Sequence, residues 1–233
     1  MKKTYFLIKI ALLVVVILVL NVDVTTRKGI NFEVRTVKIP LYLKALNFFD
    51  RHYNYKHLVR QILDKNDPAE ERVMKIFNWT LENIREVPPG FPIVDNHVWT
   101  IIVRGCGACD QSHDVFTTLC NYAGIRSYYA WVDSADGKKR YPFSFVKLQK
   151  RWCILDPCGG VYFKNNREGL ADLNEMQCGN FSVVKLKEDQ ELSYTAYLGN
   201  LKSTQYPGMN RANVQSPLNR LFYWLGAMGK KLK

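Results

Sequence analysis

The sequence predicts an α+β domain in which a helix that begins at a cysteine packs on an antiparallel sheet, behind an N-terminal membrane-anchor helix. Between residues 109 and 123 apolar positions recur at helical spacing. The chain then changes to aromatic and β-branched segments separated by turn residues, which is typical of hairpin-connected strands. A continuous apolar run over residues 10–20 predicts the anchor. The 233 residues are enough for one such domain.

The cysteine-bearing helix is the most specific of these elements. Its predicted buried face follows spacings of four, three, four and three: Cys109, His113, Phe116, Cys120 and Ala123. A glycine at position 124 can stop the helix, because glycine reaches the left-handed conformation favoured there. The helix dipole and free N–H groups favour a thiolate at Cys109, although the residue could equally be a small core cysteine. The preceding glycine, at position 107, would let a substrate backbone come close.

The N-terminal segment, residues 1–28, is predicted to be a membrane anchor or signal segment. Lys2 and Lys3 precede the apolar run, and no small-x-small cleavage site follows it. A retained, single-pass anchor is therefore favoured over a removed signal peptide. The lysines before the run favour a cytoplasmic N-terminus, which places the domain on the extracytoplasmic side.

The formal net charge of +12 favours an anionic partner. The lysines are scattered and no nucleic-acid motif stands out, so no nucleic-acid partner is expected. An anionic membrane or glycan fits the charge better.

The remaining elements follow from local patterns. Residues 21–40 read as a basic linker, and two short helical patterns follow. A firmer helix begins near Asp67, and a short one lies near residues 94–99. Residues 159–179 are predicted to be a loop with a brief helix near 170–174. The two short helices are predicted at 41–51 and 55–64. Four strands are predicted at 125–132, 141–148, 152–155 and 181–186, and a terminal helix at 216–232.

The chain has six cysteines: Cys106, Cys109, Cys120, Cys153, Cys158 and Cys178. In an exported domain some could pair, and Cys106 with Cys158 or Cys153 is conceivable. The Cys-x-x-Cys spacing at 106–109 also permits a redox dithiol or half of a zinc site.

Two motifs give the chain a family resemblance. The first is Gly107-Ala108-Cys109, which opens the helix that Gly124-Ile125 closes. The second is the Trp-x-x-x-Asp-Pro sequence over residues 152–157. In this order, over about residues 68–165, they resemble the transglutaminase-like superfamily, a papain-related cysteine fold. The domain is then 29–233, with an extension over 166–233.

The resemblance implies a Cys-His-Asp triad without a cofactor. Cys109 would be the nucleophile and Asp156 the acid that orients the imidazole. Trp99 resembles the side chain that some relatives direct at the oxyanion. The histidine position, however, is occupied by Tyr141, whose ordinary pKa of about 10 makes it a poor base at neutral pH. His113, one helical turn after Cys109, either reaches the thiol as a replacement base or fills space opposite Tyr141.

Three hypotheses follow. The first is thiol acyl chemistry at Cys109, which would hydrolyse or transfer amides or esters of peptides, cell wall or anionic glycans. The second is an inactive transglutaminase-like binding or scaffolding module that lacks the triad histidine. The third is a structural disulfide or metal domain built on Cys106, Cys109, Cys153 and Cys158.

Overall fold

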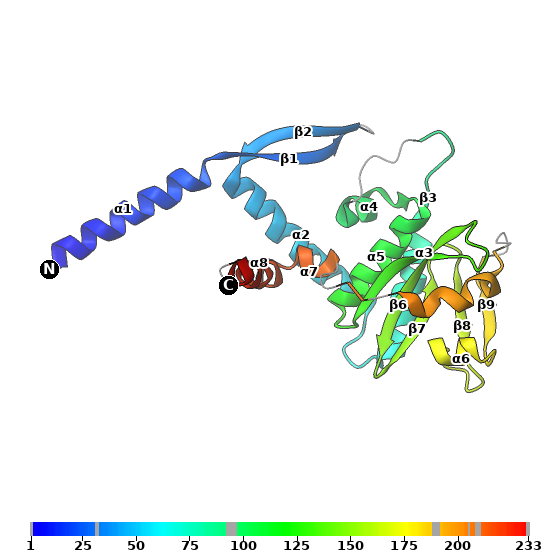
Figure 1. Cartoon of the computed structure of the whole chain (residues 1–233). Helices are drawn as coiled ribbons and strands as arrows, with labels where there is room; N and C mark the ends of the chain where they lie inside the picture. The colour runs from blue at the N-terminus through cyan, green and yellow to red at the C-terminus, as the bar shows by residue number, and fades with distance from the viewer. Residues whose placement is uncertain are drawn as a thin grey trace.

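The computed structural model describes residues 2–30, 33–91, 97–187, 192–204, 206–207 and 211–231. Its centre is a five-stranded antiparallel sheet in the order β5-β6-β7-β8-β9. These strands are Ser127–Asp133, Arg140–Leu148, Arg151–Asp156, Val161–Lys164 and Ser182–Lys185. Helix α5, Cys109–Tyr122, packs on β5 and β6, and α3, Ala69–Asn83, packs on α5 (Figure 1). The predicted α+β class and antiparallel sheet are confirmed.

Each face of the sheet has its own hydrophobic core, because alternate strand residues point to opposite faces. Val146 and Leu155 pack with the helices α3 and α5, where the rings of Phe77 and Phe116 meet edge to face at 5.9 Å. Residues of the other face lie against α6, Leu173–Gln177, and the 3₁₀ segment η1, Tyr194–Ser203. They include Phe143, Phe145, Ile154 and Phe163.

The predicted end of the cysteine-bearing helix is confirmed. Gly124 adopts a left-handed φ of 81°. Its N–H donates to the Asn121 carbonyl at 3.1 Å, and the N–H of Ile125 donates to the Cys120 carbonyl at 2.9 Å. This is the Schellman arrangement, in which glycine has no Cβ penalty. Four of the five predicted face residues are buried, and Cys109 is half-buried.

The prediction of a linker over residues 21–40 is wrong. Strands β1, Asp23–Ile30, and β2, Glu33–Pro40, form an antiparallel hairpin. The basic charge of this segment suggested a linker, but its threonines, valines and isoleucines favour strands. The two predicted short helices are one helix, α2, Leu41–Ile62, since no glycine or proline interrupts them.

The predicted membrane anchor is not supported. Residues Lys2–Leu20 do form a helix, α1, which projects away from the domain in Figure 1. Its apolar character is interrupted by Lys9. Within the residues that the structure describes, no helix combines the length and the apolar character needed to cross a membrane.

The other elements complete the chain. Strand β8 lies in the predicted loop after position 159, and Val161 and Phe163 are its buried alternate residues. Residues 94–96 of the short helix predicted at 94–99 lie outside the described residues, and α4 begins at Val98. Helix α4 spans Val98–Arg104, and the other elements are β3 Arg85–Glu86, β4 Cys106–Gly107, α7 Arg211–Gln215 and α8 Pro217–Lys231.

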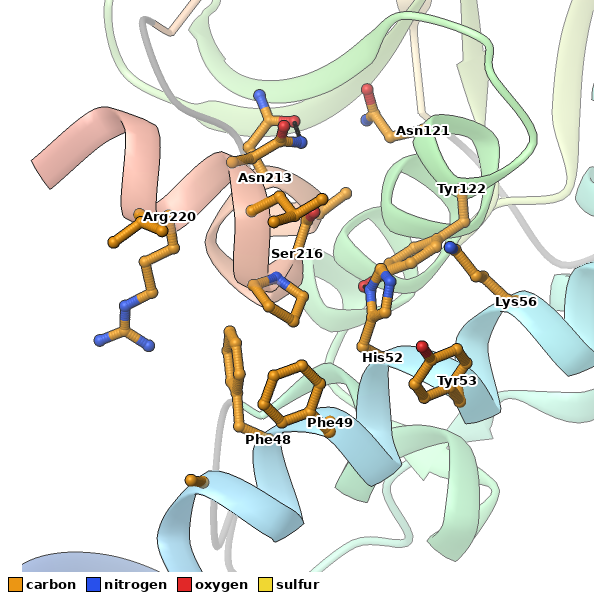
Figure 2. Close-up of a pocket in the computed structure, with 16 residues that line it drawn as sticks. Phe48, Phe49, His52, Tyr53, Lys56, Asn121, Tyr122, Asn213, Ser216 and Arg220 are labelled. Atoms are coloured by element: carbon orange, nitrogen blue, oxygen red, sulfur yellow. Dashed lines mark hydrogen bonds between the residues drawn. The ribbon is translucent and has the colours of Figure 1, made fainter. Parts of the chain in front are cut away.

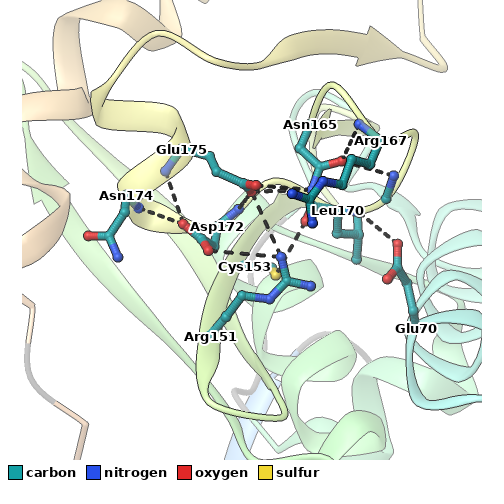
Figure 3. Close-up of polar contacts among 10 residues, drawn as sticks. Glu70, Arg151, Cys153, Asn165, Arg167, Leu170, Asp172, Asn174 and Glu175 are labelled. Atoms are coloured by element: carbon teal, nitrogen blue, oxygen red, sulfur yellow. Dashed lines mark hydrogen bonds and ion pairs between the residues drawn. The ribbon is translucent and has the colours of Figure 1, made fainter.

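Polar side chains fasten the segment after β8 to β7 and α3 (Figure 3). Glu70, in the first turn of α3, accepts a hydrogen bond from the Leu170 N–H at 2.6 Å. Asp172 caps α6 by accepting from the N–H of Glu175 at 3.0 Å. Arg151 of β7 lies 3.9 Å from Asp172 and 4.0 Å from Glu175. These contacts hold in place the strand that ends at Asp156.

Candidate active site

The first turn of α5 is fixed by the side chain of Gln111. Its Oε1 accepts a hydrogen bond from the Ala108 N–H at 3.1 Å and another from Arg104 Nη2 at 2.7 Å. Arg104 Nε also donates to the Cys106 carbonyl at 2.6 Å. The chain is therefore held on both sides of Cys109, the first residue of the helix.

Gly107 serves this turn rather than a substrate. A Cβ there would lie 3.0 Å from Cβ and Oε1 of Gln111 and 3.1 Å from Cγ2 of Ile101. We therefore expect Gly107→Ala to lower the free energy of unfolding by about 1–3 kcal/mol through overpacking. Urea unfolding would measure this, with Gly199→Ala as the control, because a Cβ at Gly199 meets no atom within 4 Å. Equal stability of the two variants would contradict the prediction.

A continuous chain of contacts joins Cys109 to the acid of the Asp-Pro motif. Cys109 Sγ lies 3.6 Å from the hydroxyl oxygen of Tyr141 on β6. That hydroxyl donates to Asp156 Oδ2, at the end of β7, at 2.9 Å. The phenol thus stands between sulfur and carboxylate, which is the place of the imidazole in a Cys-His-Asp triad.

Asp156 is completely buried and accepts several hydrogen bonds. Besides Tyr141, the donors are the Tyr194 hydroxyl at 2.7 Å and the N–H groups of Cys158 and Gly159 at 3.0 and 2.8 Å. Burial raises the pKa of this carboxyl, but the neighbouring His113 imidazole, the Gly159 N–H and the Tyr194 hydroxyl outweigh burial and lower it overall. The carboxylate is therefore ionised at neutral pH. Tyr194, from η1, is a site residue that no sequence pattern indicates.

His113 lies behind the carboxylate rather than beside the thiol. Its Nε2 is 3.3 Å from Asp156 Oδ1, without the alignment of a hydrogen bond, and its Nδ1 lies 2.8 Å from the Ser144 hydroxyl. The ring is fully buried and meets the Tyr141 ring edge to face at 6.4 Å. Of the two interpretations of His113, this geometry agrees better with packing opposite Tyr141.

Cys109 is joined to Cys158 by a disulfide. The bond connects the start of α5 to the turn between β7 and β8, and the two Cα atoms are 5.2 Å apart. Cys106 and Cys153 carry free thiols, so the pairings considered for Cys106 are wrong. The sequence could not indicate the partner of Cys109, because the contact depends on where β7 ends.

Trp99 lies in the α-helical core, where its ring meets Tyr55 of α2 edge to face at 5.2 Å. The backbone N–H of Trp99 donates at 3.3 Å to Nδ1 of His97, which caps α4. These contacts give Trp99 a packing role, and they do not support the predicted oxyanion contact. In the described parts of the chain, no group of three or more His, Cys, Asp or Glu side chains could hold a metal ion.

A cavity of about 980 Å³ lies at the opposite end of α5 (Figure 2). It is bounded by α2 residues such as Phe48 and His52, by Tyr122 at the end of α5, and by Ser216 and its neighbours between α7 and α8. The 14 residues of α5 span roughly 20 Å, so this cavity is separate from Cys109.

A comparison with models of known protein families agrees with this fold. The family model of the transglutaminase-like superfamily matches residues 56–157, which include Cys109, Tyr141 and Asp156. No curated protein sequence matches the chain.

Three solved structures are similar. A proposed cysteine protease from Cytophaga hutchinsonii has 13% identity and a TM-score of 0.40, over 63% of this chain and 56% of that one. A proposed protease from Parabacteroides distasonis has 14% identity and a TM-score of 0.39, over 70% and 39%. A TGase has 12% identity and a TM-score of 0.37, over 81% and 54%. This chain thus spans little more than half of each structure or less, and likeness this weak says nothing of substrate.

The motif order, the antiparallel sheet behind the cysteine helix and the match of the family model agree with one another. Over residues 56–157, the resemblance of this chain to the transglutaminase-like superfamily is confirmed.

Proposed function

We propose that the protein, once Cys109 is reduced, hydrolyses or transfers acyl groups of amides or esters with Cys109 as nucleophile. The observation that carries this proposal is the unbroken contact from Cys109 Sγ through the Tyr141 hydroxyl to Asp156. Peptide, cell-wall and anionic-glycan substrates, and the extracytoplasmic location, stay predictions.

The reaction would start from a thiolate that attacks the acyl carbon. Asp156 is unsuited to keep the thiol proton, because its pKa is lowered by its surroundings. The proton would instead leave to solvent, and the Tyr141 hydroxyl could then turn its own proton to the sulfur and stabilise the anion. The backbone N–H of Cys109, the first residue of α5, would donate to the developing oxyanion.

This mechanism predicts an alkaline pH profile. In the reduced protein, the rate of acyl-enzyme formation at Cys109 from p-nitrophenyl acetate should increase with pH up to the ordinary thiol pKa of about 8.5. The rate should show no plateau at neutral pH. Mass spectrometry of the labelled peptide would measure the rate. Tyr141→Phe should slow acylation by about tenfold, the effect of one hydrogen bond to a charged group. Tyr162→Phe, on β8, is the matched control and should react as the unmodified chain does.

The second candidate is an inactive transglutaminase-like binding or scaffolding module. It is favoured by the position of the His113 imidazole, which lies against Asp156 and not at the sulfur. If reduced Cys109 forms no acyl-enzyme at any pH up to about 9.5, above the ordinary thiol pKa, the enzyme proposal is wrong and the inactive module is favoured.

A further inference from the structure

We infer that Cys109 and Cys158 are a reversible, hydroperoxide-responsive thiol pair, in which Cys158 resolves the oxidised nucleophile and protects it. This inference rests on the proposed function of Cys109. A disulfide that served stability alone would permanently occupy the sulfur that lies 3.6 Å from the Tyr141 hydroxyl.

The backbone holds the two cysteines close together by contacts that do not involve their sulfurs. The Gln111 side chain fixes the start of α5, as described above. In the turn after β7, the N–H of Cys158 donates to Asp156, and Lys187 Nζ donates to the Cys158 carbonyl at 3.0 Å. The Cα separation of 5.2 Å lies within the range that a disulfide spans. We therefore expect the pair to open and close without rearrangement of the chain.

Within the pair, exposure favours oxidation at Cys109 rather than at Cys158. Cys109 is half-buried, so a small peroxide can reach it, whereas Cys158 is only 5% exposed. Burial raises the pKa of the Cys153 thiol to about 12, and it also raises that of Cys120. These two thiols are therefore poor competitors for an oxidant, because the thiolate is the reactive form.

The chemistry consists of two balanced steps. The Cys109 thiolate attacks one oxygen of the hydroperoxide and breaks its O–O bond, which gives a sulfenic acid and releases hydroxide or alkoxide. The Cys158 thiol then attacks the Cys109 sulfur, an S–S bond forms and water leaves. Overall the peroxide is reduced by two electrons and the pair is oxidised by two. A dithiol reverses this by exchange and becomes a disulfide itself.

The test uses the full chain. Reduced protein is titrated with hydrogen peroxide, and iodoacetamide labelling and peptide mapping follow each cysteine. We expect one peroxide equivalent to remove two hydrogen atoms, to join Cys109 to Cys158 and to abolish alkylation of Cys109. A dithiol should restore alkylation under native conditions. In Cys158→Ser, one equivalent of peroxide should instead leave Cys109 as sulfenic acid, and a second equivalent should convert it to sulfinic acid, which a dithiol does not restore. Cys106→Ser is the matched control and should behave as the unmodified chain does.

Three results would overturn the inference: no Cys109–Cys158 bond after peroxide, a bond that a dithiol cannot open in folded protein, or equal over-oxidation in Cys158→Ser and the unmodified chain. The acylation assay keeps this outcome separate from the proposed function. If the pair cycles but reduced Cys109 forms no acyl-enzyme, the thiol pair stands and the enzyme proposal fails. If Cys158→Ser forms the acyl-enzyme while the pair in the unmodified chain cannot be opened, the enzyme proposal stands and the reversible thiol pair is wrong.

Discussion

Tyr141→His is expected to raise the rate of acyl-enzyme formation in the reduced protein by about 100- to 10,000-fold at neutral pH. An imidazole has an ordinary pKa near 6.5 and can accept the thiol proton, whereas a phenol with a pKa of about 10 cannot. Asp156 is already in contact with the side chain at this position, at 2.9 Å. It could therefore orient the imidazole as the acid of a Cys-His-Asp triad does.

The comparison that matters is with Tyr141→Phe, which removes the hydroxyl without supplying a base. Single-turnover rates with p-nitrophenyl acetate across pH 6–10 would separate the two, a range that covers the ordinary pKa values of imidazole, thiol and phenol. Tyr141→His should level off above the imidazole pKa, whereas Tyr141→Phe should keep rising with pH. Identical pH profiles would mean that a base at position 141 cannot act on Cys109. Position 141 would then not correspond to the histidine of a Cys-His-Asp triad.

Asp156→Ala should lower the free energy of unfolding by about 3–5 kcal/mol, because it leaves several buried donors without an acceptor. These are the hydroxyls of Tyr141 and Tyr194 and the N–H groups of Cys158 and Gly159. Asp156→Asn should cost less, about 1–3 kcal/mol, since the tyrosine hydroxyls can accept from the new amide. Urea unfolding of the reduced variants at pH 7 measures both values.

The pH dependence of stability offers a second check on Asp156. Its pKa is lower in the folded chain than in the unfolded one, so its contribution is complete above the unfolded value of about 4 and is lost as the pH falls through the folded value. Asp156→Asn lacks this titration. We therefore expect the unmodified chain to lose more stability than Asp156→Asn between pH 7 and about pH 3. Parallel losses would show that the carboxyl is not ionised preferentially in the folded state.

Local patterns predicted the elements that local rules determine. The helix from Cys109 to Gly124 has an apolar period and a glycine stop, and the strands β5, β6 and β7 follow turn residues. The sequence also contains a strand signal for β8. Val161 and Phe163 are alternate apolar residues, and the segment is bounded by two glycines before it and two asparagines after it. The strands β1 and β2 are harder to predict, because their basic residues are typical of a linker while their β-branched residues favour strands.

The contacts within the site depend on tertiary placement, which spacing along the chain does not determine. Helical spacing places His113 and Cys109 on one face of α5. The His113 side chain, however, contacts Asp156 and Ser144, which lie on two different strands. Tyr194 reaches the carboxylate from a segment 38 positions later in the chain. No local pattern marks such a residue, since its role exists only after η1 packs on the sheet.

The Cys109–Cys158 bond also closes a loop, because it joins residues that are 49 positions apart in the chain. By the chain-entropy account, a loop of this length restricts the unfolded ensemble enough to stabilise the folded chain by about 4 kcal/mol. The disulfide-bonded form, which has no free nucleophile, would then be the more stable one. The reduced form would unfold more often and would be cleaved by proteases more often. A cell that switched this protein on by reduction would shorten its lifetime by the same act.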